Sequence, residues 1–383
     1  MNSKERIQSS LNHREPDHLP LDLCSTKVTG IARVTYEKLA PRLGLTADDL
    51  GFTDIKQQLA QVSEEFLDRM MVDTRGLYAG SPSGWRMELE ESEEGFSYTD
   101  EWGIVRFKPK VDGYYYDMTA HPLSGPLTVA EVEKYPWPNP EDPSRIEGLL
   151  EAAEGVQADG KALLIGGAAS GILEMSLWLR GFEDFFSDLI LDRKLAQAIL
   201  DHVTAIKIAY WSKVLPLLGD TVSVVVEVDD LATQNGLMIS PDIYRKMIKP
   251  CHTKVHQAIK EASKGRVKIF FHSCGAVREL LPDLIESGID ILNPLQVSAA
   301  GMEPSEIKRD FGDVLSFWGG AVNSQSTLPR GTPDEVRDET KRNIETLAPG
   351  GGFVFAPIHN VQRDVPVENF MAMWETWREY AGL

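Results

Sequence analysis

The feature that most constrains the fold is a regular alternation of short apolar segments with helical patterns. Six segments rich in β-forming residues lie at 162–166, 222–227, 267–271, 289–292, 315–318 and 352–356. Two earlier segments, 19–23 and 74–79, have the same character. Continuous apolar strands separated by helices predict a parallel sheet that is covered on both faces. Eight such units predict an α/β protein with a (β/α)8 TIM barrel.

One stretch departs from this alternation. Residues 85–122 alternate polar and aromatic side chains, interrupted by Gly95 and Gly103, which predicts antiparallel β-hairpins inserted after the second strand. Early helices are predicted at 31–41 and 56–70. An open doubly wound sheet is the competing architecture, but no Gly-x-Gly-x-x-Gly follows the first strand. We therefore predict one barrel domain over residues 1–383, with the hairpin excursion at 85–122.

A histidine and a cysteine follow the apolar run at 267–271. Side chains two positions apart leave the same face of a strand, so His272 and Cys274 are predicted to project together. In a barrel they would lie where active sites form, at the carboxyl ends of the strands. An imidazole and a thiolate suit zinc, which takes nitrogen and sulfur ligands in a tetrahedral arrangement. The alternative is a buried histidine, satisfied by the backbone, beside an inert cysteine.

Other polar residues are predicted to meet at the same rim. Glu227 and Asp229 are expected to share a strand face, with Asp230 in the following loop. These carboxylates are candidates for metal binding or general base catalysis, and capping of the next helix is the structural alternative. His359 follows the last strand and is a candidate for contact with the metal or the substrate.

Substrate binding is predicted for four residues on or just after strands one, two and six: Cys24, Arg75, Asn293 and Gln296. His252 and His256 lie four positions apart on a helix, a spacing that can hold zinc. No acidic partner of the expected pattern accompanies them, so a packed or solvated helix face is the favoured interpretation.

Charge and composition exclude several functions. The net charge of −19 and the lack of a dense basic patch argue against a nucleic-acid surface, and they disfavour a polyanionic substrate. No apolar run is long enough to span a bilayer, and the amino terminus lacks the apolar core of a signal peptide. Three cysteines are an odd number for a disulfide framework and fit a reducing compartment. We expect a cytoplasmic protein without nucleic-acid or membrane partners.

Several motifs together resemble the uroporphyrinogen decarboxylase superfamily over nearly the whole chain. They are Gly-Gly-Ala-Ala-Ser-Gly at 166–171, Leu-Arg-Gly-Phe-Glu at 179–183, Val-Asp-Asp at 228–230, Ile-Ser-Pro at 239–241, Lys-Pro at 249–250, His-Ser-Cys-Gly at 272–275, and Ala-Pro-Ile-His at 356–359 followed by Pro366, Glu368 and Asn369. The superfamily includes zinc methyltransferases that move methyl groups between corrinoid proteins and thiols such as coenzyme M. Its fold, a (β/α)8 barrel, is what the resemblance implies here.

The resemblance is closer to the methyltransferase branch. The decarboxylases bind substrate carboxylates with arginines after strand one and contact the pyrroles with an aspartate after strand two, and segments 23–30 and 78–81 contain neither. The methyltransferases have a His-x-Cys pair where this chain has His272 and Cys274. Their third zinc ligand is usually a cysteine near the last strand, where this chain has His359. The resemblance thus implies zinc bound by His272, Cys274 and either Glu227 or His359.

The function implied is zinc-dependent methyl transfer between a corrinoid and a thiol or similar acceptor, such as coenzyme M or a folate. Methylcobalamin or a related corrinoid would be the substrate or be carried by a partner protein, and the methyl source would be a methoxylated aromatic, through O-demethylation, or a methylamine. Catalytic roles are assigned to Glu227, Asp229, Asp230 and His359. The alternative is a decarboxylase or tetrapyrrole-binding protein of porphyrin metabolism, using Asp229 or Asp230 with His359 and no metal. A non-enzymatic partner subunit is a third hypothesis, and a homodimer is the candidate assembly.

Overall fold

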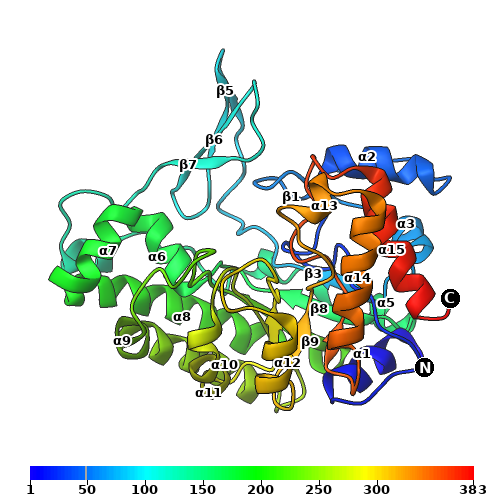
Figure 1. Ribbon diagram of the computed structural model, residues 1–383. Coiled ribbons are helices and arrows are strands. Elements are labelled where there is room, and N and C mark those ends of the chain that lie inside the picture. Colours follow the sequence, from blue (N-terminus) through cyan, green and yellow to red (C-terminus); the bar gives the residue numbers. More distant parts are fainter. Residues whose placement is uncertain (48–49) are drawn as a thin grey trace.

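A parallel sheet forms the centre of the protein. The computed structural model describes residues 1–47 and 50–383 (Figure 1). Seven strands pair in the order β13-β12-β11-β10-β9-β8-β3, and each pairing is parallel. Their bounds are β3 (Thr74–Leu77), β8 (Ala162–Gly166), β9 (Val222–Val228), β10 (Lys268–His272), β11 (Ile291–Asn293), β12 (Ser316–Trp318) and β13 (Phe353–Val354).

The segment around Leu21 closes this sheet into a barrel. Leu21 forms a parallel bridge with Phe355, directly after β13. On its other side, the backbone N–H of Asp73, directly before β3, donates to the carbonyl of Leu21 at 2.9 Å. The segment thus lies between the two edge strands, and all eight predicted strand positions contribute to the barrel. The predicted TIM barrel is confirmed.

Alternate residues of each strand face opposite sides of the barrel wall, as the two-residue period of a strand requires. One buried cluster fills the interior, with members Ala162, Leu164, Val224, Val226, Phe270, Ile291, Trp318 and Val354. Ile7 and Leu11 of the first helix belong to the same cluster. The intervening residues, such as Val225 and Phe271, pack outward in the larger cluster beneath the helices. The barrel interior is therefore a packed core.

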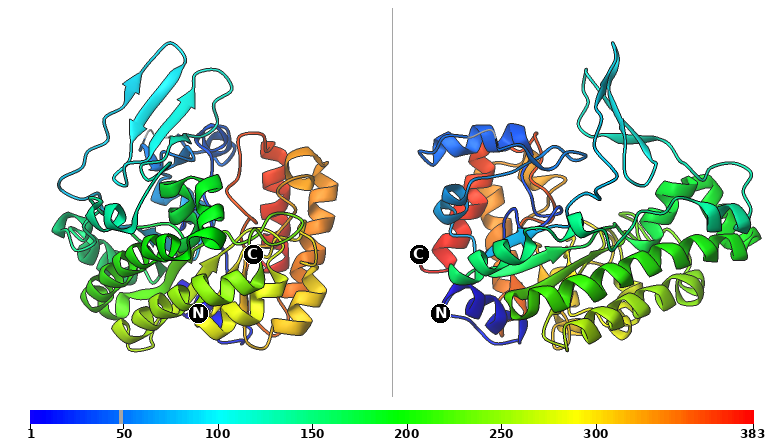
Figure 2. Two further views of the ribbon diagram at one scale, coloured as in Figure 1. Left: turned by 90° about the vertical axis from the view of Figure 1, so that its left-hand side faces the viewer. Right: turned by 180° about the vertical axis from the view of Figure 1, so that it is seen from behind.

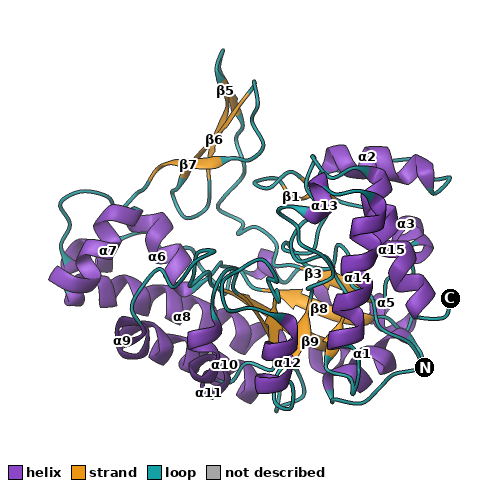
Figure 3. Cartoon of the chain, viewed as in Figure 1, coloured by secondary structure: helices purple, strands orange, loops and turns teal. Residues whose placement is uncertain are grey.

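Helices surround the strands (Figure 3). They are α1 (Ser3–Leu11), α2 (Arg33–Arg42), α3 (Glu64–Arg69), α4 (Val129–Lys134), α5 (Leu149–Ala158), α6 (Ile172–Arg180), α7 (Phe182–Leu191), α8 (Arg193–Leu218), α9 (Pro241–Ile243), α10 (Lys249–Ala262), α11 (Leu281–Ser287), α12 (Pro304–Phe311), α13 (Thr327–Arg330), α14 (Pro333–Leu347) and α15 (Val367–Tyr380). Among the described residues, no helix combines the length and the apolar character needed to cross a membrane.

The predicted hairpin insertion forms a separate antiparallel sheet. Its order is β4 (Glu90–Glu91), β5 (Gly95–Thr99), β6 (Val105–Pro109) and β7 (Asp117–Ala120). This sheet projects from the barrel and its helices, as two further views show (Figure 2). The insertion after the second strand is thus present as predicted.

The predicted helix at 56–70 is wrong in its first half. The chain instead forms a small hairpin of β1 (Phe52–Asp54) and β2 (Leu59–Ala60), and only α3 at the end of the range is helical. The turn between the strands includes Gln58 at a φ of 56°, and the Asp54 carboxylate accepts a hydrogen bond from the Gln57 backbone at 3.0 Å. Local turn geometry and strand pairing outweigh helix propensity here.

Candidate metal centre

Three potential metal ligands meet at the mouth of the barrel. His272 ends β10, Cys274 lies two residues further on, and His359 lies in the loop after β13. One ligand atom from each lies within 4.8 Å of the others. The Sγ of Cys274 and the Nε2 of His272 are 3.5 Å apart. Strands that are distant in sequence thus bring together the two nitrogens and one sulfur that zinc favours.

The orientation of His272 is set from behind by Asn293. The two residues are opposite each other on β10 and β11, and His272 Nδ1 lies 2.6 Å from Asn293 Oδ1. Because Asn293 Nδ2 donates to the carbonyl of Trp318 at 2.8 Å, its Oδ1 is left to accept from the ring. His272 Nδ1 therefore carries the proton, and Nε2 presents its lone pair toward Cys274.

The protonation states at this centre follow from burial. Burial, together with the neighbouring His272, lowers the pKa of His359 to about 3, so its imidazole is neutral near pH 7. Burial, with Asp230 and Glu174 close by, raises the pKa of the Cys274 thiol. The imidazole is thus ready to bind a cation, whereas the thiol loses its proton only when a positive charge is supplied.

Two acidic side chains border the metal ligands. Asp230 accepts a hydrogen bond from the Cys274 backbone at 2.7 Å and lies 3.9 Å from His272 Nε2. Glu174, in the first turn of α6, accepts from Ser170 Oγ at 3.0 Å. Burial, reinforced by Asp230 and Asp229, raises the pKa of Glu174 to about 8. The centre therefore has one carboxylate and one carboxyl group that holds its proton near neutral pH.

Glu227 and Asp229 share a face, as predicted, but it is the outer one. In the register of β9 and β10, Glu227 lies opposite the outward-facing Phe271, whereas Val228 lies opposite His272. Glu227 accepts a hydrogen bond from Trp211 Nε1 at 2.6 Å and forms an ion pair with Lys207 at 3.0 Å. The structure therefore brings His359, and not Glu227, to the His272–Cys274 pair.

Asp229 is fully buried among helix ends. Its carboxylate accepts hydrogen bonds from the backbone N–H groups of Leu173 and Glu174 at 2.8 and 2.9 Å, so it caps α6. The capping alternative had predicted that it would cap the helix that follows β9. His252 Nε2 lies 2.9 Å from the same carboxylate. His252 and His256 are both buried, so of the packed or solvated helix face that we favoured, the packed form is present. Asp229 positions the first turn of α6, which carries Glu174.

The four predicted substrate-binding residues lie outside the cavity described below. Arg75 is buried and pairs with Glu64 and Asp68 at 2.6 and 2.8 Å. Asn293 lies behind His272, and Gln296 accepts from the Gly275 backbone at 2.6 Å. Cys24 lies at a φ of 64°, and burial raises the pKa of its thiol. In this structure Arg75, Asn293 and Gln296 hold neighbouring groups in place.

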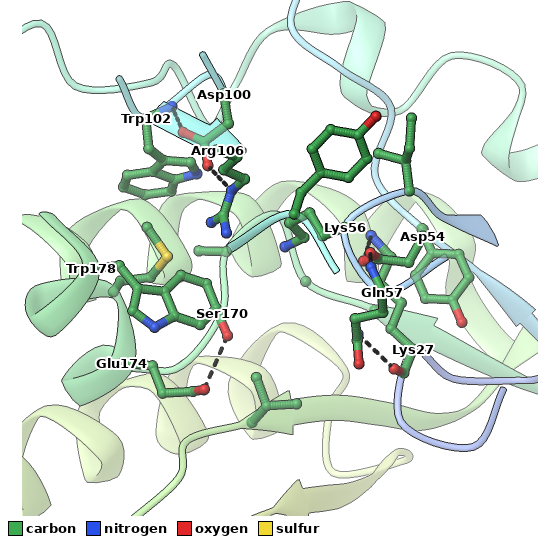
Figure 4. Close-up of a pocket in the computed structure, with 18 of the residues that line it drawn as sticks. Lys27, Asp54, Lys56, Gln57, Asp100, Trp102, Arg106, Ser170, Glu174 and Trp178 are labelled. Atoms are coloured by element: carbon green, nitrogen blue, oxygen red, sulfur yellow. Dashed lines mark hydrogen bonds and ion pairs between the residues drawn. The ribbon is translucent and has the colours of Figure 1, made fainter. Parts of the chain in front are cut away.

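A cavity of about 940 Å³ opens above the metal ligands. Its floor includes His272, His359 and Asp230 from the barrel rim. Its walls come from α6, from the β1–β2 hairpin and from the inserted antiparallel sheet (Figure 4). Aromatic side chains contribute much of the wall, namely Phe52, Tyr78, Trp85, Tyr98, Trp102, Tyr115, Tyr116 and Trp178. The size and lining suit a ligand larger than a small thiol alone.

Several cavity residues were missed by the sequence reasoning. Glu174, Trp178, Lys56 and Arg106 all line the cavity. Only Glu174 had a recognisable signal, because it stands three residues after Gly171 in the capping position of a helix that follows a glycine-rich turn. The others lie on an ordinary helix face, a turn and an inserted strand, where the sequence pattern does not reveal what they face.

The fold and the site define a TIM-barrel protein with a His–Cys–His group at the mouth of the barrel. The profile of the Uroporphyrinogen decarboxylase (URO-D) family matches residues 116–380, and the chain belongs to this family. A search of curated protein sequences finds no match.

A solved structure shows the same fold over the whole chain. A methyltransferase from Methanosarcina mazei superposes with a TM-score of 0.66 over 99% of both chains, at 18% sequence identity. The endo-1,4-β-xylanase XylE from Penicillium canescens has a TM-score of 0.35 and 14% identity, and the match covers 56% of this chain and 67% of that enzyme. The first of these supports the barrel over the full length of the chain.

Proposed function

We propose that this protein is a zinc-dependent methyltransferase that moves a methyl group between a corrinoid and a thiol. The observation that carries the proposal is the convergence of His272, Cys274 and His359, whose ligand atoms lie within 4.8 Å of one another beside a large cavity. Membership of the uroporphyrinogen decarboxylase family and the fold shared with a methyltransferase are consistent with it.

The three side chains fit zinc by their chemistry. Two neutral imidazoles and one thiolate are preferred zinc ligands, and three protein ligands leave one tetrahedral position for a substrate. Zinc bound there would lower the pKa of a substrate thiol so that the thiolate forms near neutral pH. His272 would bind through Nε2, because Asn293 occupies its Nδ1.

The surrounding residues would hold the thiol and move its proton. Asp230 lines the cavity 3.9 Å from His272, so its carboxylate can accept the proton that the thiol releases. The thiolate sulfur then uses a lone pair to form a bond with the methyl carbon. The cobalt–carbon bond breaks and its electron pair stays on cobalt, giving a methyl thioether and a reduced corrinoid. The open mouth would admit a corrinoid carried by a partner protein.

Decarboxylation of a polycarboxylated tetrapyrrole is less well supported. The cavity is lined by three basic side chains, Lys27, Lys56 and Arg106, against six acidic ones, Asp54, Asp100, Glu101, Asp117, Glu174 and Asp230. A substrate with many carboxylates would meet more negative than positive charge at close range. Among the described residues that line this cavity, there is no bidentate arginine pair of the kind that binds such a substrate.

Metal analysis tests the zinc site. Protein purified without added zinc is expected to contain about one zinc ion per chain by mass spectrometry, because the thiolate and two imidazoles form a three-ligand site. Cys274→Ser should lose most of it. Cys251→Ser is the matched control, because Cys251 is a buried thiol on α10 that donates to the carbonyl of Met247, away from the site. Metal-free protein, or an equal loss in both variants, would contradict the assignment.

Methyl transfer is tested with free methylcobalamin and a thiol, following the cobalamin absorption spectrum under anaerobic conditions. The zinc-loaded protein should convert methylcobalamin to the reduced corrinoid only when a thiol is present, and Cys274→Ser should abolish this. A zinc-loaded protein that turns over no thiol, but decarboxylates uroporphyrinogen, would favour the alternative function.

A further inference from the structure

Two cationic side chains, one from the β1–β2 hairpin and one from the inserted sheet, converge over one ring of the cavity wall. Lys56 lies in the turn between β1 and β2, and Arg106 lies on β6. The ammonium of Lys56 is 5.5 Å from the centroid of Trp178, and the guanidinium carbon of Arg106 is 5.3 Å from the same ring. Figure 4 shows both cations directed toward the space above Trp178. The three residues form an open cationic pocket, here called the Lys56–Arg106 clamp.

The positive charge of this clamp is only partly neutralised by the protein. Arg106 donates through Nε to Asp100 at 2.8 Å, so one acidic group is committed to it. In the part of the chain that the structure describes, the Lys56 ammonium makes no hydrogen bond and no ion pair. Burial lowers the pKa of Lys56, and the nearby charges of Arg106 and Lys27 lower it further against the opposing effect of Asp54.

Two acidic groups, Asp54 and Asp100, act on the charge of Lys56, and both also face another cation. Asp54 accepts from the Gln57 backbone at 3.0 Å and lies 3.9 Å from Lys27. Glu101 pairs with Arg145. Glu174 holds its proton near neutral pH, as described above. Asp54 and Asp100 thus face the three cations Lys27, Lys56 and Arg106, while Asp117 is exposed to solvent. One positive charge is left to be neutralised by a ligand, which fits a single negative charge and not a polyanion.

We propose that the Lys56–Arg106 clamp binds the carboxylate or sulfonate of a small molecule that takes part in the methyl transfer, with Trp178 beneath it. The inference rests on the proposed function, and it adds the class of substrate, a monoanion. The clamp and the two histidines of the metal centre, His272 and His359, line the same cavity, so a ligand bound by its anionic end can extend toward the barrel rim. Such a molecule is either an anionic thiol that accepts the methyl group or a methoxylated aromatic acid that donates it.

Calorimetry on the full-length protein tests the clamp with matched ligand pairs. The acceptor arm compares 3-mercaptopropionate with 3-mercaptopropanamide, and the donor arm compares 3-methoxybenzoate with 3-methoxybenzamide. In at least one arm the acid should bind about tenfold more tightly than the amide, because hydrogen bonds to charged groups are worth more than neutral ones. The arm that shows this preference identifies which source the clamp serves.

The variant Lys56→Gln should weaken binding of that acid about tenfold and leave the amide unchanged. After this substitution Asp54 keeps Lys27 as a partner, whereas loss of Arg106 would leave Asp100 without its ion-pair partner. Lys56→Arg should restore most of the acid affinity. Lys110→Gln is the matched control, because Lys110 follows β6 on the same inserted sheet and pairs with Glu91 outside the cavity.

Equal affinity for acid and amide in both arms would overturn the proposal, as would equal effects of Lys56→Gln and Lys110→Gln. These measurements need neither zinc nor methyl transfer. A charge preference that depends on Lys56 in a protein without methyltransferase activity would refute the proposed function and leave the anion site. Methyl transfer without that charge preference would support the proposed function and refute the anion site.

Discussion

His272 presents one particular nitrogen to the metal centre because Asn293 binds the other. Asn293 is fully buried between His272 and the carbonyl of Trp318. Its side-chain oxygen and nitrogen each have a hydrogen-bond partner, so the amide cannot turn over freely. Such outer partners of a metal-binding histidine fix the ring and its proton. Asn293 therefore contributes to the site without lining the cavity.

We expect Asn293→Ala to weaken zinc binding about 10- to 100-fold, because the His272 ring loses the group that fixes its tautomer. Competition with a chromophoric zinc chelator measures this. Asn343→Ala is the control, since Asn343 is also buried and donates to the carbonyl of Ala321 at 3.2 Å. If both variants bind zinc equally well, the positioning role of Asn293 is refuted.

Glu174 makes stability depend on pH. Its carboxyl ionises near a pKa of 4.5 in the unfolded chain and near 8 in the folded protein. Between these values the unfolded state has released the proton and the folded state has not, so the free energy of unfolding falls as pH rises. Glu174→Gln cannot ionise and should escape this loss. Its melting temperature relative to the parent protein should therefore be higher at pH 9 than at pH 5.

Thermal melts of chelator-treated protein at the two pH values provide the measurement. Glu335→Gln is the control, because Glu335 occupies the same capping position of α14. Hydrogen bonds from the Thr332 backbone and hydroxyl lower the pKa of Glu335, so that carboxylate is ionised in both states from pH 5 to 9. Its variant should show the same shift at both pH values. If Glu174→Gln also changes the melting temperature by the same amount at both pH values, the Glu174 carboxyl of the parent protein ionises normally.

The start of α6 depends on a close contact between backbone and carboxylate. A Cβ added at Gly171 would lie 2.1 Å from Asp229 Oδ1 and 2.5 Å from Asp229 Cα. Only glycine leaves room for Asp229 to cap the helix that carries Glu174 and Trp178. The glycine-rich turn after β8 therefore serves to bring a helix end against the barrel rim.

We expect Gly171→Ala to lower the free energy of unfolding by about 1–3 kcal/mol through overpacking. Gly155→Ala, in the exposed part of α5, should raise it by up to about 1 kcal/mol, because nothing lies within 4 Å of the added methyl and alanine favours a helix. Urea unfolding of both variants separates the two effects. Equal stability would mean that the chain relaxes around Gly171 at little cost.

In β9, the sequence predicts the strand itself but not which of its alternate side chains face the barrel interior. The mostly apolar run at 222–227 predicts a buried strand, and the alternation correctly groups Glu227 with Asp229. Which group faces the barrel interior depends on the register with β10, where Val228 lies opposite His272. A shift by one residue would reverse the assignment. The pattern of a single strand contains no such information.

At the scale of the whole molecule, the barrel is held closed near its amino-terminal end by Asp73. Its carboxylate accepts from the backbone N–H of Leu21 at 2.9 Å and from Arg6 of α1 at 2.5 Å. It thus joins the closing segment, the start of β3 and the helix that packs against the barrel core. Asp73 and Arg6 are both buried.

Asp73→Ala should lower the free energy of unfolding by about 1–3 kcal/mol, because it leaves the buried N–H of Leu21 without its acceptor, whereas Arg6 keeps Asp17 as a partner. Asp68→Ala should cost about 1 kcal/mol or less, because the Asp68 side chain is 61% exposed and Arg75 keeps Glu64 as a partner. Chemical denaturation of the two variants gives the comparison. Similar costs would show that barrel closure does not depend on Asp73.

The sequence by itself determined the alternation of strands and helices, the inserted hairpins and the pairing of His272 with Cys274, because these depend on periods of two and 3.6 residues within short segments. Only the tertiary structure decided that His359 joins the pair, that Glu227 and Asp229 turn outward, and that Lys56 and Arg106 meet over Trp178. Those juxtapositions arise from barrel closure, strand register and the placement of insertions. Each of these involves residues far apart in the chain, and local patterns do not encode the geometry between them.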